Sequence, residues 1–219
     1  MHQSEAPSRR PLKTRQSRWA RGLAAWLARH GVTPNTVSVA SVLFGALAGL
    51  AFSLSFEADG ETCAPYLVAA GAFIQLRLLC NMLDGLIAVE GGRGSPAGEV
   101  YNDLPDRIAD AFIFVGAGLA RRGMTGGVTL GWLAALLACL TAYVRVLGGS
   151  LGLPQSFAGP MAKQHRMFVL TVACVTASAE AALARPPRTL YAALVLIVAG
   201  SAYTAAARTR GIVRALRHR

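Results

Sequence analysis

NMLDGLIAVEGGRGSPAGEVYNDLPD, residues 81–106, is the stretch of the sequence that decides the fold. It joins an apolar segment that ends near residue 88 to another that begins near residue 100, and the connection, residues 89–98, is rich in glycine. Glycine and proline interrupt helices, so this connection is predicted to join two antiparallel helices. Asp84 and Asp106 stand at the two helix ends that the connection brings together.

The two flanking segments belong to a series of apolar stretches that runs through the chain. A helix of about 20 apolar residues crosses the hydrocarbon core of a bilayer. Of the 219 residues 53% are hydrophobic and 15% charged, whereas soluble domains carry about 25% charged residues. Disordered and collagen-like chains are excluded, and an ordinary soluble domain is disfavoured. The sequence predicts an all-α polytopic membrane protein with six transmembrane helices, over residues 34–55, 65–88, 100–120, 127–147, 167–184 and 188–207.

The N-terminal segment has a different pattern, in which apolar side chains recur at about helical spacing among arginines and lysines. Leu12, Trp19, Leu23, Trp26 and Leu27 form this series. The pattern predicts an amphipathic helix that lies in the membrane interface; the alternative is a solvated basic tail. Three parts are therefore expected: a basic tail with the amphipathic helix (1–33), a six-helix transmembrane catalytic domain (34–207) and a basic cytoplasmic tail (208–219).

The net charge of +11 comes from 22 lysines and arginines that are unevenly distributed. With the predicted spans, seventeen lie on the face that holds both termini and four on the other face. Cytoplasmic loops carry the excess of such residues, so both termini and residues 81–106 are predicted on the cytoplasmic side of the cell (inner) membrane. The same distribution disfavours nucleic acid as a partner, because the cations flank the spans and form no separate basic domain.

The acidic residues are rare, and they are concentrated in one place. Six of eleven lie between residues 84 and 110. Asn81 and Asp84 share one helix face, and Asn102 and Asp106 share another. If the two helices are antiparallel, carboxylate and amide oxygens converge at the cytoplasmic surface, a donor set that suits Mg²⁺ or Mn²⁺. The alternative is a polar network that joins helices within the membrane, with Arg77 neutralising Asp84.

These residues resemble the signature of the CDP-alcohol phosphotransferase (phosphatidyltransferase) family, D-x2-D-G-x2-A-R-x8-G-x3-D-x3-D. The spacing is kept throughout: Asn81-x2-Asp84-Gly85-x2-Ala88-Val89-x8-Gly98-x3-Asn102-x3-Asp106. Residues 31–35, GVTPN, resemble the family's entry to the first span. Residues 143–145, YVR, with 162–166, AKQHR, resemble its later cytoplasmic basic region.

Three positions depart from the family pattern. Asparagine replaces the first and third aspartates at Asn81 and Asn102, and Val89 replaces the arginine. An asparagine still offers a carbonyl oxygen, but each change removes one negative charge, so the site attracts cations less strongly. One metal ion, or weaker binding of two, is expected in this variant branch.

The resemblance implies an integral membrane enzyme that moves a phosphatidyl group from a CDP-linked donor, such as CDP-diacylglycerol, to an alcohol acceptor and releases CMP. It implies a homodimer and a Mg²⁺ or Mn²⁺ cofactor held by Asn81, Asp84, Asn102 and Asp106. Asp106 is also implied as the general base. Three small residues would let the nucleotide approach the backbone closely: Gly85, Ala88 and Gly98. Three basic residues would hold the phosphate of an acceptor: Arg145, Lys163 and Arg166.

Two other functions remain as alternatives. A relative that is catalytically weak or inactive would keep the pocket for nucleotide-lipid and act as a membrane scaffold. A small cation transporter is disfavoured, because Asp84 and Asp106 are predicted at the membrane surface and not at its centre. The sequence leaves the acceptor alcohol open.

Overall fold

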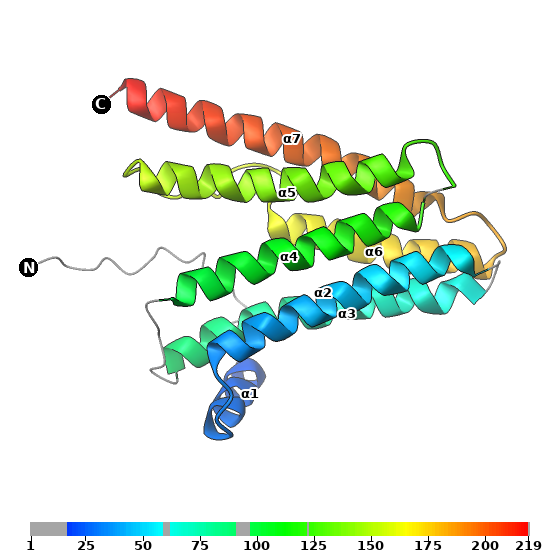
Figure 1. Cartoon of the computed structure of the whole chain (residues 1–219), viewed down its shortest axis with the longest axis horizontal. Coiled ribbons are helices and arrows are strands. Elements are labelled where there is room, and N and C mark those ends of the chain that lie inside the picture. Colours follow the sequence, from blue (N-terminus) through cyan, green and yellow to red (C-terminus); the bar gives the residue numbers. More distant parts are fainter. Residues whose placement is uncertain (1–16, 59–61, 91–96, 122, 219) are drawn as a thin grey trace, which may run out of the picture.

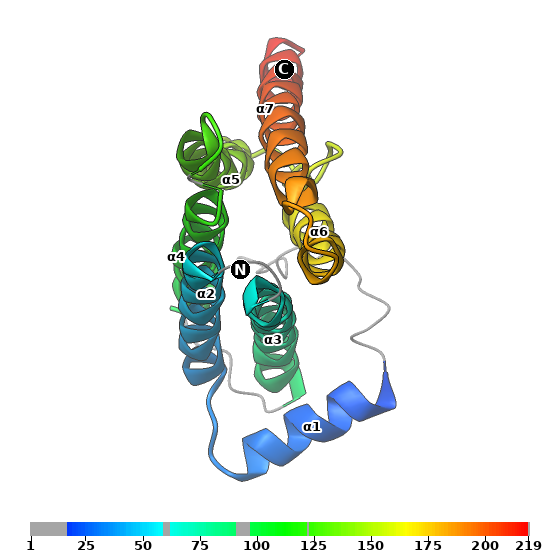
Figure 2. The same ribbon diagram turned by 90° about the vertical axis from the view of Figure 1, so that its right-hand side faces the viewer.

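The computed structural model describes residues 17–58, 62–90, 97–121 and 123–218, and within this part of the chain helices joined by loops are the regular structure (Figure 1). The described residues form seven helices, of which the last six run side by side as a bundle and the first lies across one end of it (Figure 2). In chain order they are α1 (Arg18–Arg29), α2 (Pro34–Glu57), α3 (Cys63–Glu90), α4 (Gly98–Leu119), α5 (Gly127–Ser150), α6 (Lys163–Ala182) and α7 (Arg188–Arg217). The prediction of an all-α polytopic membrane protein is confirmed.

Four of the helices, α2, α3, α5 and α7, are long and apolar enough to cross a membrane. The helices α4 and α6 match the other two predicted spans in position, but they carry more charge. Asp103, Asp106 and Asp110 lie on α4, and Lys163 and Arg166 on α6. The six-span arrangement therefore stays a prediction. These charges face one another inside the bundle, as described below.

The amphipathic pattern near the N-terminus corresponds to α1. Ala20 and Ala24 are buried against an apolar cluster from α3 that includes Leu83 and Ile87. Trp19 and Trp26 are exposed on the helix, as an interfacial helix requires. Leu12, which was predicted to continue this face, lies outside the described residues.

The start of α2 is fixed by local chemistry. Thr33 has extended backbone angles, and its hydroxyl accepts a hydrogen bond from the Thr36 amide at 3.2 Å. This caps one of the backbone N–H groups that a helix start leaves unpaired. Pro34 occupies the first turn, where it needs no N–H.

The helices α2 and α4 are in close backbone contact. A Cβ atom built on Gly116 would lie 2.4 Å from Gly49 Cα, and one built on Gly49 would lie 2.5 Å from the carbonyl oxygen of Phe112. Membrane helices approach this closely where small residues face one another. This contact fixes the position of α4, and with it the acidic residues, against the rest of the bundle.

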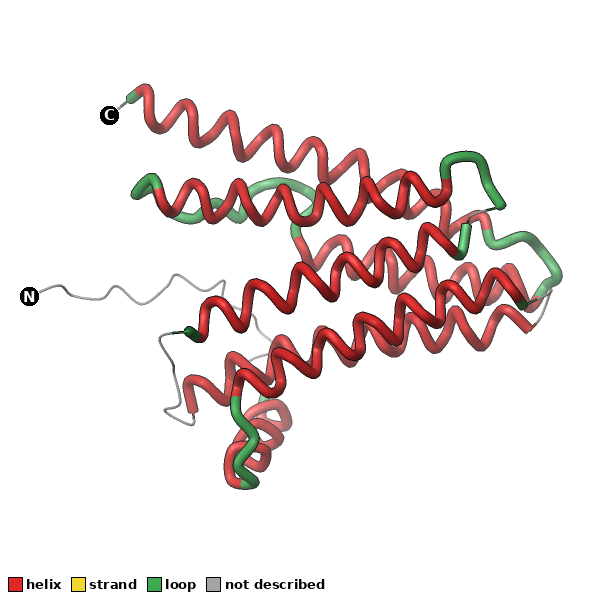
Figure 3. The backbone as a smooth tube through the Cα atoms, viewed as in Figure 1, coloured by secondary structure: helices red, strands yellow, loops and turns green. Residues whose placement is uncertain are grey.

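The loop of residues 151–162 runs back along α5 before α6 begins (Figure 3). Its end is held by α7: the Met161 amide donates to Thr204 Oγ1 at 3.1 Å. As a result α6 starts deeper in the bundle than its neighbours, with Lys163 beside α4 (Figure 1). At the other end of the chain, α7 continues through Arg217, so most of the predicted basic tail is an extension of this helix.

Candidate active site

Asp106 is the centre of the site, and it is 5% exposed. Its Oδ1 accepts hydrogen bonds from Asn81 Nδ2 at 2.8 Å and from Arg77 Nη2 at 3.2 Å. Its Oδ2 accepts from the Lys163 ammonium, and Arg107 Nη2 lies 3.7 Å from the same oxygen. The predicted convergence of Asn81 and Asp106 is thus present, with three cations around the carboxylate.

Asp110 lies one turn further along α4 and forms a second buried ion pair. Its Oδ1 accepts from Arg77 Nη2 at 2.5 Å, and its Oδ2 lies 3.6 Å from Arg166 Nη2. Arg77 is 0% exposed and Arg166 1%. Buried charges of this kind are stable only when they are paired, since desolvation of each ion is costly.

Asp103 completes the acidic stripe of α4, which has members at positions 103, 106 and 110. Arg145 of α5 holds both its carboxylate oxygens, at 2.9 and 3.1 Å. The Arg145 guanidinium also donates to Gln155 Oε1 at 3.1 Å and lies 5.7 Å from the centre of the Phe157 ring. This pair is more exposed than the other two.

Asp84 of α3 is buried and faces α2. The Ser38 hydroxyl donates to its Oδ2 at 2.7 Å. The alternative in which Arg77 neutralises Asp84 is wrong, because Arg77 pairs with Asp106 and Asp110.

Several predicted residues lie apart from these contacts. Asn102 is exposed and makes no side-chain hydrogen bond within the described part of the chain. Gly85 and Ala88 are partly buried on α3, and Gly98 is the first residue of α4. Val89 belongs to α3, but its side chain lies outside the described residues.

The three cations that were predicted to bind an acceptor phosphate, Arg145, Lys163 and Arg166, contact three different carboxylates of α4. Arg166 also donates to Thr141 Oγ1 at 3.1 Å and to the Met161 carbonyl at 2.9 Å. The cations therefore form one row along the acidic stripe and not a separate basic pocket.

Sequence reasoning missed the pair of Asp103 with Arg145 and the contact of Arg77 with Asp106. The signals were present: Arg77 is a lone cation within an apolar helix, and positions 103, 106 and 110 have the spacing of one helix face. Such a face identifies charges that need partners, but it does not say which helix supplies them.

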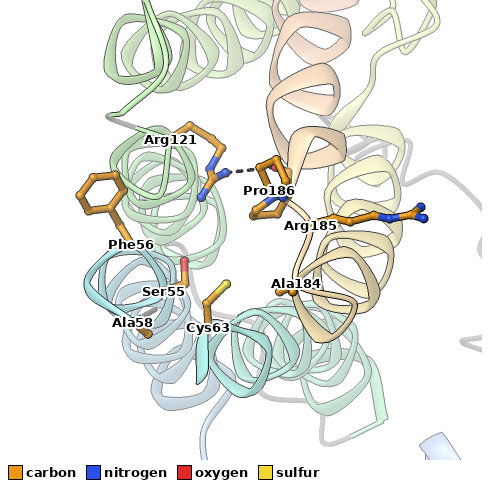
Figure 4. Close-up of a pocket in the computed structure, with 10 residues that line it drawn as sticks. Ser55, Phe56, Ala58, Cys63, Arg121, Ala184, Arg185 and Pro186 are labelled. Carbon is orange, nitrogen blue, oxygen red and sulfur yellow. Dashed lines mark hydrogen bonds between the residues drawn. The ribbon is translucent and has the colours of Figure 1, made fainter. Parts of the chain in front are cut away.

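A cavity of about 310 Å³ lies at the opposite end of the bundle (Figure 4). Cys63, Arg121 and Pro186 are among the residues that line it, and Arg121 donates to the Pro187 carbonyl at 3.1 Å. None of the predicted site residues lines this cavity.

The chain is similar in sequence to two bacterial proteins of known name. It is 32% identical over 155 residues to a phosphatidylinositol phosphate synthase of Streptomyces avermitilis, over 68% of this chain and 59% of that protein. It is 27% identical over 146 residues to the inner membrane protein YnbA of Escherichia coli, over 66% of this chain and 67% of that protein. The chain therefore spans less than two thirds of the Streptomyces relative. No family model matches the chain.

The fold is similar to that of solved phosphatidylinositol phosphate synthase structures. The crystal structure of Mycobacterium tuberculosis phosphatidylinositol phosphate synthase with CDP-DAG bound superimposes with a TM-score of 0.75 at 20% identity, over 90% of this chain and 94% of that one. The same enzyme in complex with manganese and citrate gives a TM-score of 0.74 at 21% identity, over 88% of each chain. In sequence the chain is thus similar to one phosphatidylinositol phosphate synthase and to YnbA, and in fold it is similar to another phosphatidylinositol phosphate synthase.

One of these phosphatidylinositol phosphate synthase structures holds manganese. Whether the present chain could hold a divalent metal ion depends on the oxygen atoms that its own residues leave available. Both oxygens of Asp106 are bonded to cations, and Asn81 directs its amide nitrogen, a donor, at Asp106. Within the described residues, no three or more His, Cys, Asp or Glu side chains form a group that could hold a metal ion.

The charges at the site also disfavour binding of a divalent metal ion. Two unit charges 4 Å apart interact by about 4 kcal/mol at an effective dielectric constant of 20, and a divalent ion doubles this value for each carboxylate. An asparagine has no charge, so positions 81 and 102 lack this attraction between a carboxylate and the ion. Lys163 and Arg77 are positively charged and repel a further cation. The residues as they are arranged do not fit a divalent metal ion.

Proposed function

We propose that the chain is a membrane phosphotransferase that transfers a phosphatidyl or other substituted phosphoryl group from a CDP-linked donor to an alcohol acceptor, with release of CMP. CDP-diacylglycerol is the first donor to test, since a distantly related fold binds CDP-DAG. The observation that carries the proposal is Asp106: a buried carboxylate at the family's position, surrounded by cations where α3, α4 and α6 meet.

In this proposal Asp106 acts as the general base. It takes the proton of the acceptor hydroxyl while the acceptor oxygen forms a bond to the phosphorus next to the lipid. The bond from that phosphorus to the CMP oxygen breaks, and CMP leaves with the electron pair. Side-chain cations next to Asp106 stabilise the negative charge on the phosphates, because their field is strong in a site with little water.

The remaining residues have supporting roles. The ammonium of Lys163 has three donors, so it can hold Asp106 and a phosphate oxygen together. Gly85, Ala88 and Gly98 would leave space for the nucleotide beside the backbone. The resemblance implies a Mg²⁺ or Mn²⁺ ion with Asn81, Asp84, Asn102 and Asp106 as ligands, but the present arrangement of these residues does not fit such an ion, and no step above depends on it.

The setting of the enzyme belongs to the same proposal. We place both termini and the Asp106 site on the cytoplasmic face of an inner membrane, with α1 in the interface and α4 and α6 as the third and fifth of six spans. A homodimer is the expected assembly. Reaction of an externally added thiol reagent with single cysteines introduced after α7 and between α4 and α5 tests the orientation in intact cells.

The test of activity is CMP release by the purified protein in lipid micelles that contain CDP-diacylglycerol. Glycerol 3-phosphate, inositol phosphate and serine are offered in turn as acceptors. Removal of a general base costs about 100-fold or more, so Asp106→Asn should nearly abolish CMP release. Glu180→Gln is the control, because Glu180 bonds Thr189 at the far end of the bundle. Absence of CMP with every acceptor contradicts the proposal.

A binding protein without activity is the second candidate. The observation that favours it is the engagement of both Asp106 oxygens by cations, which a purely structural network would also show. This candidate predicts saturable binding of CDP-diacylglycerol with no release of CMP, and the same preparation can be used for both measurements.

A further inference from the structure

We infer that Lys163 and Arg77 occupy the place of a divalent cation at Asp106, so that this chain binds the diphosphate of its donor through side-chain cations and not through a metal ion. The inference rests on the proposed function for the identity of the ligand. Its claim about the metal stands on the site geometry alone.

The first observation is the position of the cations. A metal ion bridging Asp84 and Asp106 would have to share an Asp106 oxygen with a cation, because Lys163 is bonded to one of these oxygens and Arg77 to the other. Both come from elements that are fixed in place: Arg77 is fully buried on α3, and Lys163 begins α6 where the preceding loop is held by α7. They are part of the folded core of the site.

The second observation concerns Asn81. Its amide nitrogen donates to Asp106 Oδ1 at 2.8 Å. An aspartate at this position would face the Asp106 carboxylate with a like charge, and it would need a cation between the two. The asparagine removes that need, because it bonds the carboxylate directly. The departure from the family pattern and the arrangement of Lys163 and Arg77 therefore have one physical explanation.

The third observation is the balance of charge in the described part of the site. Five basic side chains (Arg77, Arg107, Arg145, Lys163 and Arg166) pair with the α4 carboxylates or lie beside them, and the carboxylates number four when Asp84 is included. At this site three buried nitrogens, Nε and Nη1 of Arg77 and Nε of Arg166, and one buried carboxylate oxygen, Oδ2 of Asp110, have no hydrogen-bond partner. A site with surplus positive charge suits an anion such as a diphosphate, and it repels a metal ion.

Manganese binding to the purified protein, measured by electron paramagnetic resonance, tests the inference without catalysis. We expect no saturable binding by the wild-type chain. The M. tuberculosis phosphatidylinositol phosphate synthase, whose structure was solved with manganese, is the positive control. A triple variant, Asn81→Asp/Asn102→Asp/Lys163→Met, should gain a site. Stoichiometric binding by the wild-type chain that is lost in Asp84→Asn overturns the inference.

CMP release provides the second arm. Activity should be unchanged by EDTA or by added Mg²⁺, and Lys163→Met should lower it by about 100-fold. Lys163→Arg keeps the positive charge and should recover part of the loss, which a role in packing alone does not predict. Activity that EDTA abolishes and Mg²⁺ restores overturns the inference. If no CMP appears under any condition, the proposed function fails, and the manganese measurement still decides whether side chains replace the metal.

Discussion

Arg77 should be the most important single side chain for the stability of the bundle end that holds the site. It is fully buried and contacts Asp110 at 2.5 Å and Asp106 at 3.2 Å. In Arg77→Met the methionine fills part of the space, but Asp110 keeps only Arg166, at 3.6 Å. Removal of one partner of a buried ion pair costs about 3–5 kcal/mol, because the other charge is left without compensation.

Arg107 offers a matched control on the same carboxylate. Its Nη2 lies 3.7 Å from Asp106 Oδ2, and its side chain is 19% exposed. A pair near solvent contributes about 0–1 kcal/mol, so Arg107→Met should change stability little. Adding Asp110→Asn to Arg77→Met should recover part of the loss, because the unpaired charge is then gone; we expect a coupling energy of about 1–3 kcal/mol.

The free energy of unfolding is measured by titration with SDS in mixed micelles, followed by circular dichroism, for wild type, the two single arginine variants, Asp110→Asn and the double variant. Equal losses in Arg77→Met and Arg107→Met would refute the reasoning, since burial and distance would then have no effect. Additive losses in the double variant would show that Arg77 and Asp110 do not act as a pair.

Two further predictions concern the frame around the site. Gly49→Val should lower the thermal unfolding temperature strongly, because its Cβ meets the Phe112 carbonyl oxygen at 2.5 Å, whereas Gly22→Ala, with nothing within 4 Å, should not; similar unfolding temperatures would contradict the close contact of α2 and α4. Ser38→Ala removes the donor to Asp84 Oδ2 and should lower the free energy of unfolding by about 1 kcal/mol or more, measured by the same SDS titration. An unchanged value would mean that Ser38 does not hold Asp84 in solution.

The helices could be predicted from apolar length alone, and the six predicted segments correspond to α2–α7. Predicting which of them span a membrane was harder, because α4 and α6 combine apolar residues with charges. Such charges lower the average hydropathy of a helix even when partners inside the protein neutralise them. Hydropathy reports the residues of one segment. Apart from the adjacent Arg107, the partners of Asp106 and Asp110 come from segments 25 or more positions away in sequence.

The site could be predicted in part. Helical spacing and an antiparallel connection were enough to bring Asn81 to Asp106. The spacing of Asn102 and Asp106 places them near each other on α4, but it does not show that Asn102 is exposed. Residues that share one side of a helix can differ in burial. Nor could it show that Lys163 would reach Asp106, because this depends on the loop of residues 151–162 turning back toward α7.

A crystal structure of the chain grown with Mn²⁺ tests the central claim most directly, through the anomalous signal at Asp84 and Asp106. We predict no manganese peak there, with the Lys163 ammonium on Asp106 Oδ2 and Arg77 on Oδ1. A manganese peak bridging Asp84 and Asp106, with Lys163 displaced from the carboxylate, would contradict the claim.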